Sequence, residues 1–412
     1  MNFDALLIYV VSYFGLFTAI FFFSTLLDYK DRLKTPRIKE YAKVSVIVPA
    51  YDEEATILKT IKSLLNLDYP KDKLEIIVVD DGSTDGTLKV ANSIKEPNVR
   101  VFTKKNGGKG SALNFGLKIC TGDFVAALDA DSFVMRNALK KMLGYFEDKN
   151  VMAVTPSLKV YKPKNFLQRI QLIEYLIGIF LRKIFAILDS IHVAPGPFSI
   201  FRKEFFDKYG GYDGDNLTED IEIALRIKSK KFKIENAADA IVYTLTPPSF
   251  MSLLKQRLRW YYGFIENVLQ YKHLFSRKYG DLGIFILPAA FISVALVIIV
   301  LFYTIFRFIT RTLIQNYKNL SSINFDFAKL FDFHFDLFFI NFNSVAVLSI
   351  LCLIIGICMI IMAKKISNET SKIKMSYLSY LLFYWVLFGV WWLTAIFYKL
   401  SGKKVIWRHK DI

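Results

Sequence analysis

Residues 44–53 read VSVIVPAYDE, a short apolar run that ends in polar residues. The run from Val44 to Pro49 is rich in β-branched side chains and predicts a buried β-strand. Downstream, strand-like and helix-like stretches alternate, which is typical of an α/β fold with a mostly parallel sheet. We expect further strands at 74–80, 99–103 and 124–129, and helices at 53–65, 84–94 and 110–120.

The composition predicts membrane segments. The chain has 412 residues, of which 53% are hydrophobic and 16% aromatic. This is more apolar than an ordinary soluble domain, and it excludes a disordered protein. Four runs without a charged residue are long enough to cross a bilayer, because a spanning helix needs about 20 residues. They lie at 6–26, 283–306, 344–363 and 376–398.

The first apolar run is expected to be a retained anchor. It is not preceded by a basic residue or followed by a small-residue cleavage site, so it does not fit a signal peptide. Basic residues follow it instead, and the positive-inside tendency then places the large polar block of the chain in the cytosol. These residues are Lys30, Arg32, Lys34, Arg37 and Lys39. We expect an integral protein of the plasma membrane.

The side of the C-terminal tail is left open. Three crossings after a cytosolic domain would put a basic tail outside the cell, against the same tendency. The aromatic segment 325–343 is interrupted by acidic residues and could be a re-entrant or interfacial piece that returns the tail to the cytosol. The basic residues of the tail are Lys399, Lys403, Lys404, Arg408 and Lys410.

Charge and metal-ligating residue types narrow the classes further. The formal net charge of +17 suits either nucleic acid or an anionic membrane surface. Because the chain also contains the apolar runs, we expect membrane lipids, and no nucleic acid, as partners. The three cysteines exclude a disulfide framework, and the four histidines lie far apart without the spacing of a metal site. We therefore expect any metal to be bound by oxygen.

Acidic residues follow three of the expected strands. Tyr51-Asp52-Glu53-Glu54, Asp80-Asp81-Gly82-Ser83 and Asp129-Ala130-Asp131 each stand where a strand ends. Ligands of parallel sheets bind beyond the carboxyl ends of the strands, so these groups should share one cleft. Several carboxylates in one cleft repel each other unless a cation is present, which suggests a divalent metal. A solvated turn or a helix cap is the alternative for each motif.

Further motifs lie downstream. The Lys104–Gly110 stretch opens a helix, so its amides and Lys109 could meet phosphate oxygens, or it could be a plain glycine turn. The region 164–188 reads either as an amphipathic helix on the membrane surface or as a buried helix. Thr218-Glu219-Asp220 offers either a helix cap or a carboxylate able to accept a proton.

One face of a helix at 249–271 carries three groups with related chemistry. Gln256, Arg259 and Trp260 stand at i, i+3 and i+4 and share this face, while Arg257 points away. The guanidinium suits a diphosphate and the indole suits stacking on a sugar ring. The alternative is that Arg and Trp anchor the chain at a membrane interface.

Taken together, these motifs resemble those of family 2 glycosyltransferases with a GT-A fold, and especially the membrane-embedded processive branch of cellulose, chitin and hyaluronan synthases. The resemblance covers about residues 44–263 and the flanking apolar runs. It rests on the motifs Val46 to Glu53, Asp80-Asp81-Gly82, Asp129-Ala130-Asp131, Thr218-Glu219-Asp220 and Gln256-Arg257-Leu258-Arg259-Trp260.

The resemblance implies a role for each motif. Asp220 would be the general base, and Asp131, with Asp129, would bind Mn²⁺ or Mg²⁺. The remaining roles concern the two substrates. The nucleotide-sugar donor would be bound by Ala50, Tyr51, Glu53, Asp80, Lys109, Asp129, Gln256 and Arg259, and the glycan or lipid acceptor by Trp260, Gly196 and Glu219.

The expected organisation has four parts. These are an anchor at 1–27, a cytosolic GT-A domain with a Rossmann-like sheet at 28–248, an interfacial helix at 249–282, and a membrane region of about three spans with a basic tail at 283–412. The expected activity is inverting transfer from a UDP-sugar to a β-linked polysaccharide, with export as a further possibility. One alternative is a single addition to a membrane lipid or polyprenyl phosphate. A transporter or scaffold with a degenerate nucleotide site is a second alternative, but Asp131, Asp220 and Arg259 are all retained.

Overall fold

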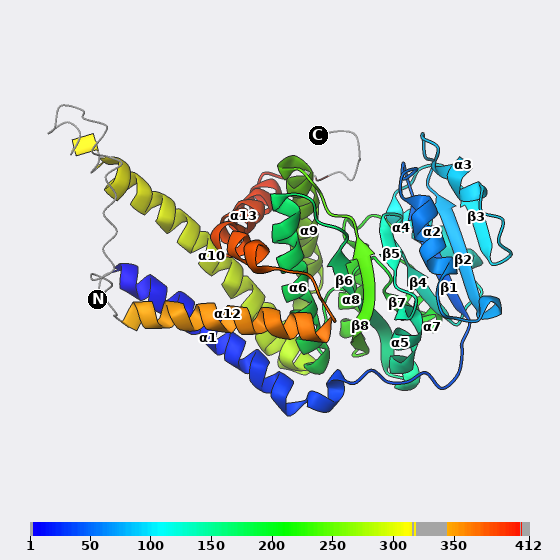
Figure 1. The fold of residues 1–412 in the computed structure, drawn as a ribbon, viewed down its shortest axis with the longest axis horizontal. Helices are drawn as coiled ribbons and strands as arrows, with labels where there is room; N and C mark the ends of the chain where they lie inside the picture. Colours follow the sequence, from blue (N-terminus) through cyan, green and yellow to red (C-terminus); the bar gives the residue numbers. More distant parts are fainter. Residues whose placement is uncertain (1–2, 315–316, 319–343, 404, 406–412) are drawn as a thin grey trace.

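The computed structural model describes residues 3–314, 317–318, 344–403 and 405. The segment 325–343 lies outside the described residues, and so do Lys404, Arg408 and Lys410 of the tail. In the described part of the chain, an eight-stranded sheet occupies one end of the molecule, and long apolar helices occupy the other end (Figure 1).

The strand order of the sheet is β3-β2-β1-β4-β7-β6-β8-β5. The first four are parallel, as expected: β1 (Val44–Ala50), β2 (Leu74–Asp80), β3 (Val99–Thr103) and β4 (Phe124–Ala127). Beyond β4 the sheet becomes mixed. There β7 (Ile200–Arg202) runs antiparallel to β4 and β6 (Val151–Val160), β8 (Lys233–Thr244) is parallel to β6, and β5 (Ser132–Val134) is antiparallel to β8.

The core lies on both faces of the parallel half. Every residue of β1 is buried, and its side chains alternate between two apolar clusters. Val46 and Val48 face the cluster that contains Ile57 and Ile61, whereas Ile47 packs with Leu113 on the opposite face. A strand covered on both faces reads as a continuous apolar run, which explains the sequence of β1. The helices of this part are α2 (Ile57–Leu65), α3 (Thr87–Asn92), α4 (Lys109–Ile119), α5 (Ala138–Leu143), α7 (Lys203–Tyr209) and α8 (Glu219–Ser229).

Two further helices separate the sheet from the apolar end of the molecule. They are α6 (Phe166–Ile187) and α9 (Phe250–Gln270), and α9 begins with a Ser249 capping box. Half of the residues of α6 are buried, including Ile173 and Phe180, which pack against apolar helices. The helix predicted at 164–188 is therefore present, and it lies between the sheet and the apolar helices.

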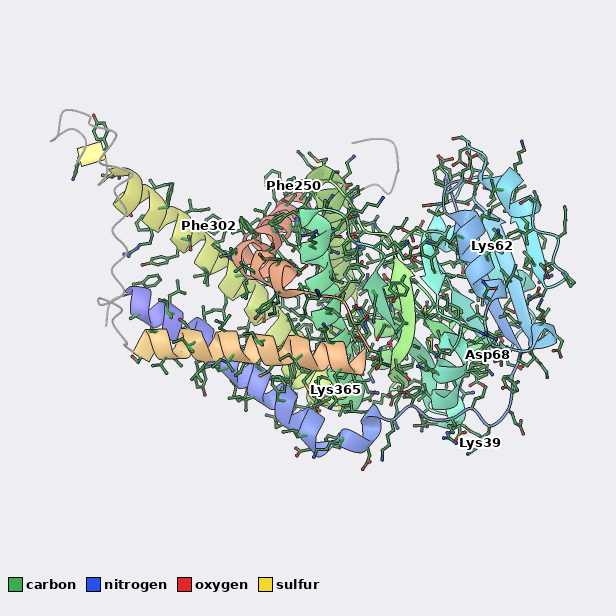
Figure 2. The ribbon with its side chains drawn as sticks, viewed as in Figure 1. Lys39, Lys62, Asp68, Phe250, Phe302 and Lys365 are labelled. Atoms are coloured by element: carbon green, nitrogen blue, oxygen red, sulfur yellow. The ribbon has the colours of Figure 1, made fainter. Side chains whose placement is uncertain are left out.

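Four helices of the described chain are long and apolar enough to cross a membrane, in agreement with the four predicted runs. They are α1 (Phe3–Asp28), α10 (Leu287–Arg307, preceded by a π-helical turn, Leu282–Ile286), α12 (Ser344–Ile366) and α13 (Lys374–Leu400). Large apolar side chains such as Phe302 point outward from them and are more than half exposed (Figure 2). Exposure on this scale is typical of a lipid-facing surface.

Candidate active site

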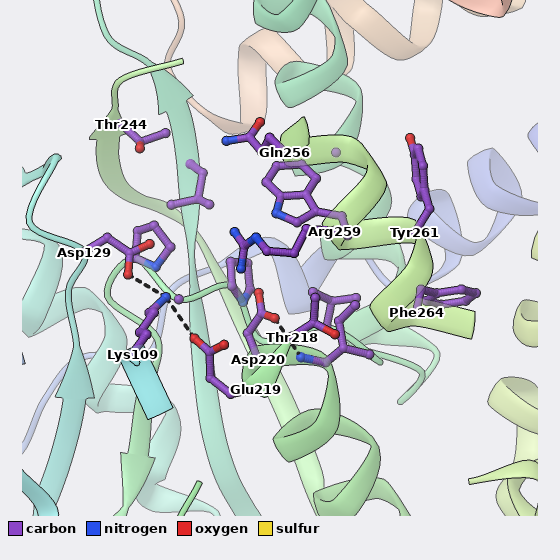
Figure 3. A pocket seen from close by; sticks show the side chains of 18 of the residues that line it. Lys109, Asp129, Thr218, Glu219, Asp220, Thr244, Gln256, Arg259, Tyr261 and Phe264 are labelled. Atoms are coloured by element: carbon purple, nitrogen blue, oxygen red, sulfur yellow. Dashed lines mark hydrogen bonds and ion pairs between the residues drawn. The ribbon is translucent and has the colours of Figure 1, made fainter. Parts of the chain in front are cut away.

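A cavity of about 680 Å³ lies beyond the carboxyl ends of β1 and β4. Its walls come from the start of α8, from one face of α9 and from α6, and its far end reaches α10 and α13 (Figure 3). Most of the predicted site residues line this one cavity. They are Ala50, Tyr51, Glu53, Lys109, Asp129, Asp131, Gly196, Glu219, Asp220, Gln256, Arg259 and Trp260.

Lys109 joins two acidic groups from different elements. Its Nζ lies 2.7 Å from Asp129 Oδ1 and 2.9 Å from Glu219 Oε1, as Figure 3 shows. Burial alone would favour neutral Lys109, but Asp129 and Glu219 outweigh it and raise the pKa of the lysine above its usual range. Gly196 packs closely against this ion pair: a Cβ atom at this position would lie only 2.6 Å from the lysine Nζ.

Asp131 and Asp129 stand close enough to act on each other. Burial, and then the carboxylates of Asp129 and Glu53, raise the pKa of Asp131 to about 7. Within the described residues, no cluster of three or more His, Cys, Asp or Glu side chains is arranged to bind a metal. An Asp pair in which burial and neighbouring carboxylates disfavour the charge of Asp131 nevertheless fits a hard divalent cation that takes its remaining ligands from water and substrate phosphates.

Asp220 lies in the first turn of α8 and faces the cavity. Its Oδ1 accepts a hydrogen bond from the backbone N–H of Ile221 at 3.0 Å. Burial, and then the neighbouring Glu219 carboxylate, raise the pKa of Asp220 to about 6. The preceding Thr218 makes no side-chain cap. Its hydroxyl instead accepts a hydrogen bond from Asn267 Nδ2 of α9, which fixes the start of α8 against that helix.

The helix α9 divides its motif between two environments, as its spacing predicted. Gln256, Arg259 and Trp260 line the cavity, and Figure 3 shows the guanidinium of Arg259 on the side of Asp220. Arg257 does not line the cavity and is fully buried, yet it contacts two residues that do: its Nη2 lies 2.7 Å from Glu174 Oε2, and its guanidinium lies 4.1 Å from the Trp260 ring. Gln256 Oε1 has no hydrogen-bond partner among the described residues, so this acceptor is available to a ligand.

Asp80 is the predicted site residue that does not line the cavity. Its carboxylate accepts hydrogen bonds from Thr103 Oγ1 at 2.8 Å and from the N–H of Ser83 at 3.3 Å, and the side chain is buried beside β3. Asp81 lines the cavity instead. It accepts the N–H of Gly108 at 2.7 Å and that of Gly107 at 3.1 Å, so these two loop amides are engaged by a carboxylate.

Comparison with known proteins identifies the family. The model of glycosyl transferase family 2 matches residues 45–210. The poly-β-1,6-N-acetyl-D-glucosamine synthase of Staphylococcus epidermidis is 31% identical over 304 residues, which is 72% of each chain. The chain belongs to the family 2 glycosyltransferases. The enzyme of the same name from Staphylococcus aureus is 32% identical over 277 residues, and the match spans about two thirds of its length, 66%, and 65% of this chain.

A solved structure shows the same fold at low identity. A mannosyltransferase from Pyrobaculum calidifontis, solved with GDP-Man and Mn²⁺, superposes with a TM-score of 0.54 and 18% identity. The superposition covers 95% of this chain and 99% of that one. This likeness confirms the expected GT-A fold for this family 2 glycosyltransferase.

One wall of the cavity in this glycosyltransferase was not predicted from the sequence. Glu174, Gly178 and Arg182 of α6 line it, together with His192 just beyond the helix. Their spacing in the sequence could have indicated this wall, because the three α6 residues stand four positions apart and so share the polar face of the helix. Burial lowers the pKa of Arg182 to about 10, and Tyr175 and Asp220 partly offset this effect.

Proposed function

We propose that this glycosyltransferase moves a sugar from a UDP-sugar to the end of a growing β-linked polysaccharide at the membrane. The observation that carries the proposal is the single cavity in which Asp220, Lys109 and Arg259 meet an aspartate pair and Trp260. The names of the relatives favour N-acetylglucosamine as the sugar.

The proposed reaction is one displacement with inversion. The acceptor hydroxyl oxygen forms a bond to the anomeric carbon while the bond from that carbon to the diphosphate oxygen breaks. The hydroxyl proton passes to Asp220, and the electron pair of the broken bond leaves with the nucleoside diphosphate. With a pKa of about 6, Asp220 is mostly deprotonated at neutral pH and able to take the proton.

The leaving group gains negative charge, which cationic side chains can stabilise. Arg259 offers a planar guanidinium suited to a diphosphate, and Gln256 lies one turn before it on the same face. Lys109 would stabilise the donor from the opposite wall. A divalent cation, Mn²⁺ or Mg²⁺, bound by Asp131 and Asp129 would add Lewis-acid stabilisation of the diphosphate. The solved neighbour binds Mn²⁺, which supports a metal here.

The acceptor is proposed to occupy the side of the cavity near the membrane helices. Trp260 offers a ring for stacking on a sugar. Gly196 and Glu219, which the resemblance also assigns to the acceptor, lie against Lys109. Beyond them the lining becomes apolar, with Phe291 and Val294 of α10 and Phe388 and Trp392 of α13. An exported glycan or the lipid part of an acceptor would both fit such a wall. We place the catalytic domain in the cytosol and the protein in the plasma membrane.

Incubation with a panel of radiolabelled nucleotide sugars tests the proposal. Membranes containing the protein receive each donor with Mn²⁺ or Mg²⁺, and the products are then sized. We expect UDP-N-acetylglucosamine to label a polymer. A single sugar on an extractable lipid would instead support single addition, and absence of transfer from every donor would refute the proposed activity.

A further inference from the structure

Three of the apolar helices have one end beside the catalytic part and the other end far from it. Near the catalytic part, Leu26 of α1 and Ala363 of α12 pack in one cluster with Phe180 of α6, and Ile286 before α10 joins them. At the distant end, the ring of Phe3 in α1 lies 5.0 Å from that of Tyr303 in α10. There the Tyr9 hydroxyl of α1 also bonds to the Ser344 hydroxyl of α12. Figure 1 shows these ends at opposite sides of the apolar part of the molecule, and we infer that they lie on the two sides of the membrane.

The beginning of α13 is fixed to the catalytic sheet. The loop that joins α12 to α13, residues 367–373, carries Glu369, whose carboxylate lies 2.9 Å from Nζ of Lys159 in β6. This ion pair is largely buried, with the Lys159 side chain 2% exposed and that of Glu369 12% exposed. Lys365, at the end of α12 that leads into the loop, lies toward the catalytic part in Figure 2, far from the Phe302 end of α10.

The end of α13 is fixed to the catalytic part as well. Lys399 Nζ lies 3.0 Å from Glu266 Oε1 of α9, and Tyr398 packs with Leu258 and Tyr262 of the same helix. Val405, beyond the helix, joins this cluster together with Leu217, which directly precedes the Thr218-Glu219-Asp220 motif.

The helix α9 is itself held on the catalytic domain near its C-terminal end. Asn267 donates to Thr218 Oγ1 at 2.9 Å, and the hydroxyl of Tyr271, just past the helix, donates to Glu222 Oε1 at 2.5 Å. Both of these acceptors belong to the start of α8. The attachment of α13 to α9 is therefore an attachment to the catalytic side.

A helix that crosses the bilayer cannot have both ends on one side. The 27 residues of α13 extend about 40 Å, more than the hydrocarbon thickness of about 30 Å. Between its ends α13 packs against α6 and α9. The Tyr384 hydroxyl lies 3.2 Å from Glu174 Oε1 of α6, and the Trp392 ring stacks on that of Tyr261 of α9 at 4.5 Å. We propose that α13 does not cross the membrane but lies along its surface on the side of the catalytic domain.

The exposed side chains of α13 fit a lipid interface as the partner of this surface. Leu378, Leu382 and Phe383 are exposed and apolar, as expected of a helix whose outer face enters the acyl boundary. Lysines stand at both ends of the helix, where one layer of anionic headgroups would bind them. They are Lys372, Lys374, Lys399 and Lys403. Two crossings, α10 and α12, then follow the catalytic domain, and the basic tail returns to its side.

Side-specific labelling of single cysteines tests this topology. The full chain with Cys120, Cys352 and Cys358 replaced by Ala would carry Ser401→Cys after α13, Lys372→Cys in the α12–α13 loop, or Phe3→Cys at the start of α1. Sealed vesicles of defined orientation then receive a membrane-impermeant maleimide. We expect Ser401→Cys to label from the same side as Lys372→Cys and from the side opposite to Phe3→Cys. Labelling of Ser401→Cys together with Phe3→Cys would overturn the proposal.

Crosslinking provides a second measurement that does not depend on vesicle orientation. In the same background, the pairs Glu266→Cys with Lys399→Cys and Lys159→Cys with Glu369→Cys receive a short bismaleimide. We expect both pairs to crosslink within one chain, whereas Phe3→Cys with Lys399→Cys, the matched distant pair, does not. Crosslinking of the Lys159–Glu369 pair without the Glu266–Lys399 pair would show that the end of α13 leaves the catalytic side, which also overturns the proposal.

Discussion

Asp220 is the side chain on which the proposed chemistry depends most directly. Its carboxylate lies in the cavity beside Glu219, and Asn has nearly the same shape without the ability to take a proton. We expect Asp220→Asn to lower kcat by about 10²-fold or more, while the donor Kd stays within about threefold. Isothermal titration with the nucleotide sugar and a transfer assay measure the two effects. Wild-type turnover in this variant would exclude Asp220 as the base.

The pH dependence of transfer should follow the same carboxylate. Burial and the Glu219 charge raise the pKa of Asp220 to about 6, and only its deprotonated form can accept the proton of the acceptor hydroxyl. Activity should therefore rise with pH through about 6 and fall about tenfold per pH unit below it. A pH profile of kcat/KM, which reports the pKa values of the free enzyme, measures this limb. A flat profile from pH 5 to about pH 8 would contradict the assignment.

Gly196 should matter for activity more than for folding. A Cβ atom at this position would press on Lys109 Nζ at 2.6 Å and on Asp129 Oδ2 at 3.2 Å, and the flexible lysine can give way. We expect Gly196→Ala to lower kcat/KM for the donor about 10- to 100-fold because it displaces the ion pair. The melting temperature should stay close to that of the wild type. Gly214→Ala, where an added Cβ meets open space, is the matched control and should keep full activity.

The elements α6 and α9 are joined by one buried ion pair. Arg257 is fully buried and has Glu174 as its ion-pair partner at 2.7 Å. Glu174→Gln removes the negative charge and leaves the buried Arg257 guanidinium without a counter-charge. This loss should destabilise the fold by about 3–5 kcal/mol. Thermal unfolding in detergent measures the loss. The double variant Glu174→Gln/Arg257→Gln should recover part of it, and Asp31→Asn, at an exposed ion pair, should cause no measurable change. An unchanged melting temperature in Glu174→Gln would refute this role of the pair.

The sequence predicted the parallel half of the sheet because its strands are short apolar runs with polar ends. It did not predict β6, since Thr155, Ser157 and Lys159 interrupt the apolar pattern although all three are buried. Lys159 is tolerated inside because Glu369, more than 200 residues away in the chain, neutralises it. Long-range pairing of this kind leaves no local signal in the sequence.

The same distinction applies to the candidate site. Helical spacing was sufficient to place Gln256, Arg259 and Trp260 on one face, because the geometry of one helix is local. Adjacent aspartates were harder to assign. Asp80 is the last residue of β2 and Asp81 the next in the chain, and only the fold of the loop before α4, whose amides bind Asp81, decides which carboxylate lines the cavity.

Across the whole molecule, the cavity joins the catalytic domain to the apolar helices. Its inner end holds the charged groups, and its outer end is lined by α10 and α13. These two helices, which are long and apolar enough to cross a membrane, therefore also form a wall of the cavity. In the proposed reaction, the donor occupies the inner end and the acceptor the outer end. The two ends should therefore respond to different substitutions.

Val294→Trp separates these two ends by experiment. Val294 of α10 lines the outer end, and an indole there would narrow the path of the acceptor without contact with the charged groups. We expect markedly shorter products with an unchanged donor Kd, measured by product sizing and by titration with the nucleotide sugar. Ile299→Trp, on an exposed part of the same helix outside the cavity lining, is the matched control and should give products of normal length. Normal length in Val294→Trp would show that the acceptor leaves the cavity by another route.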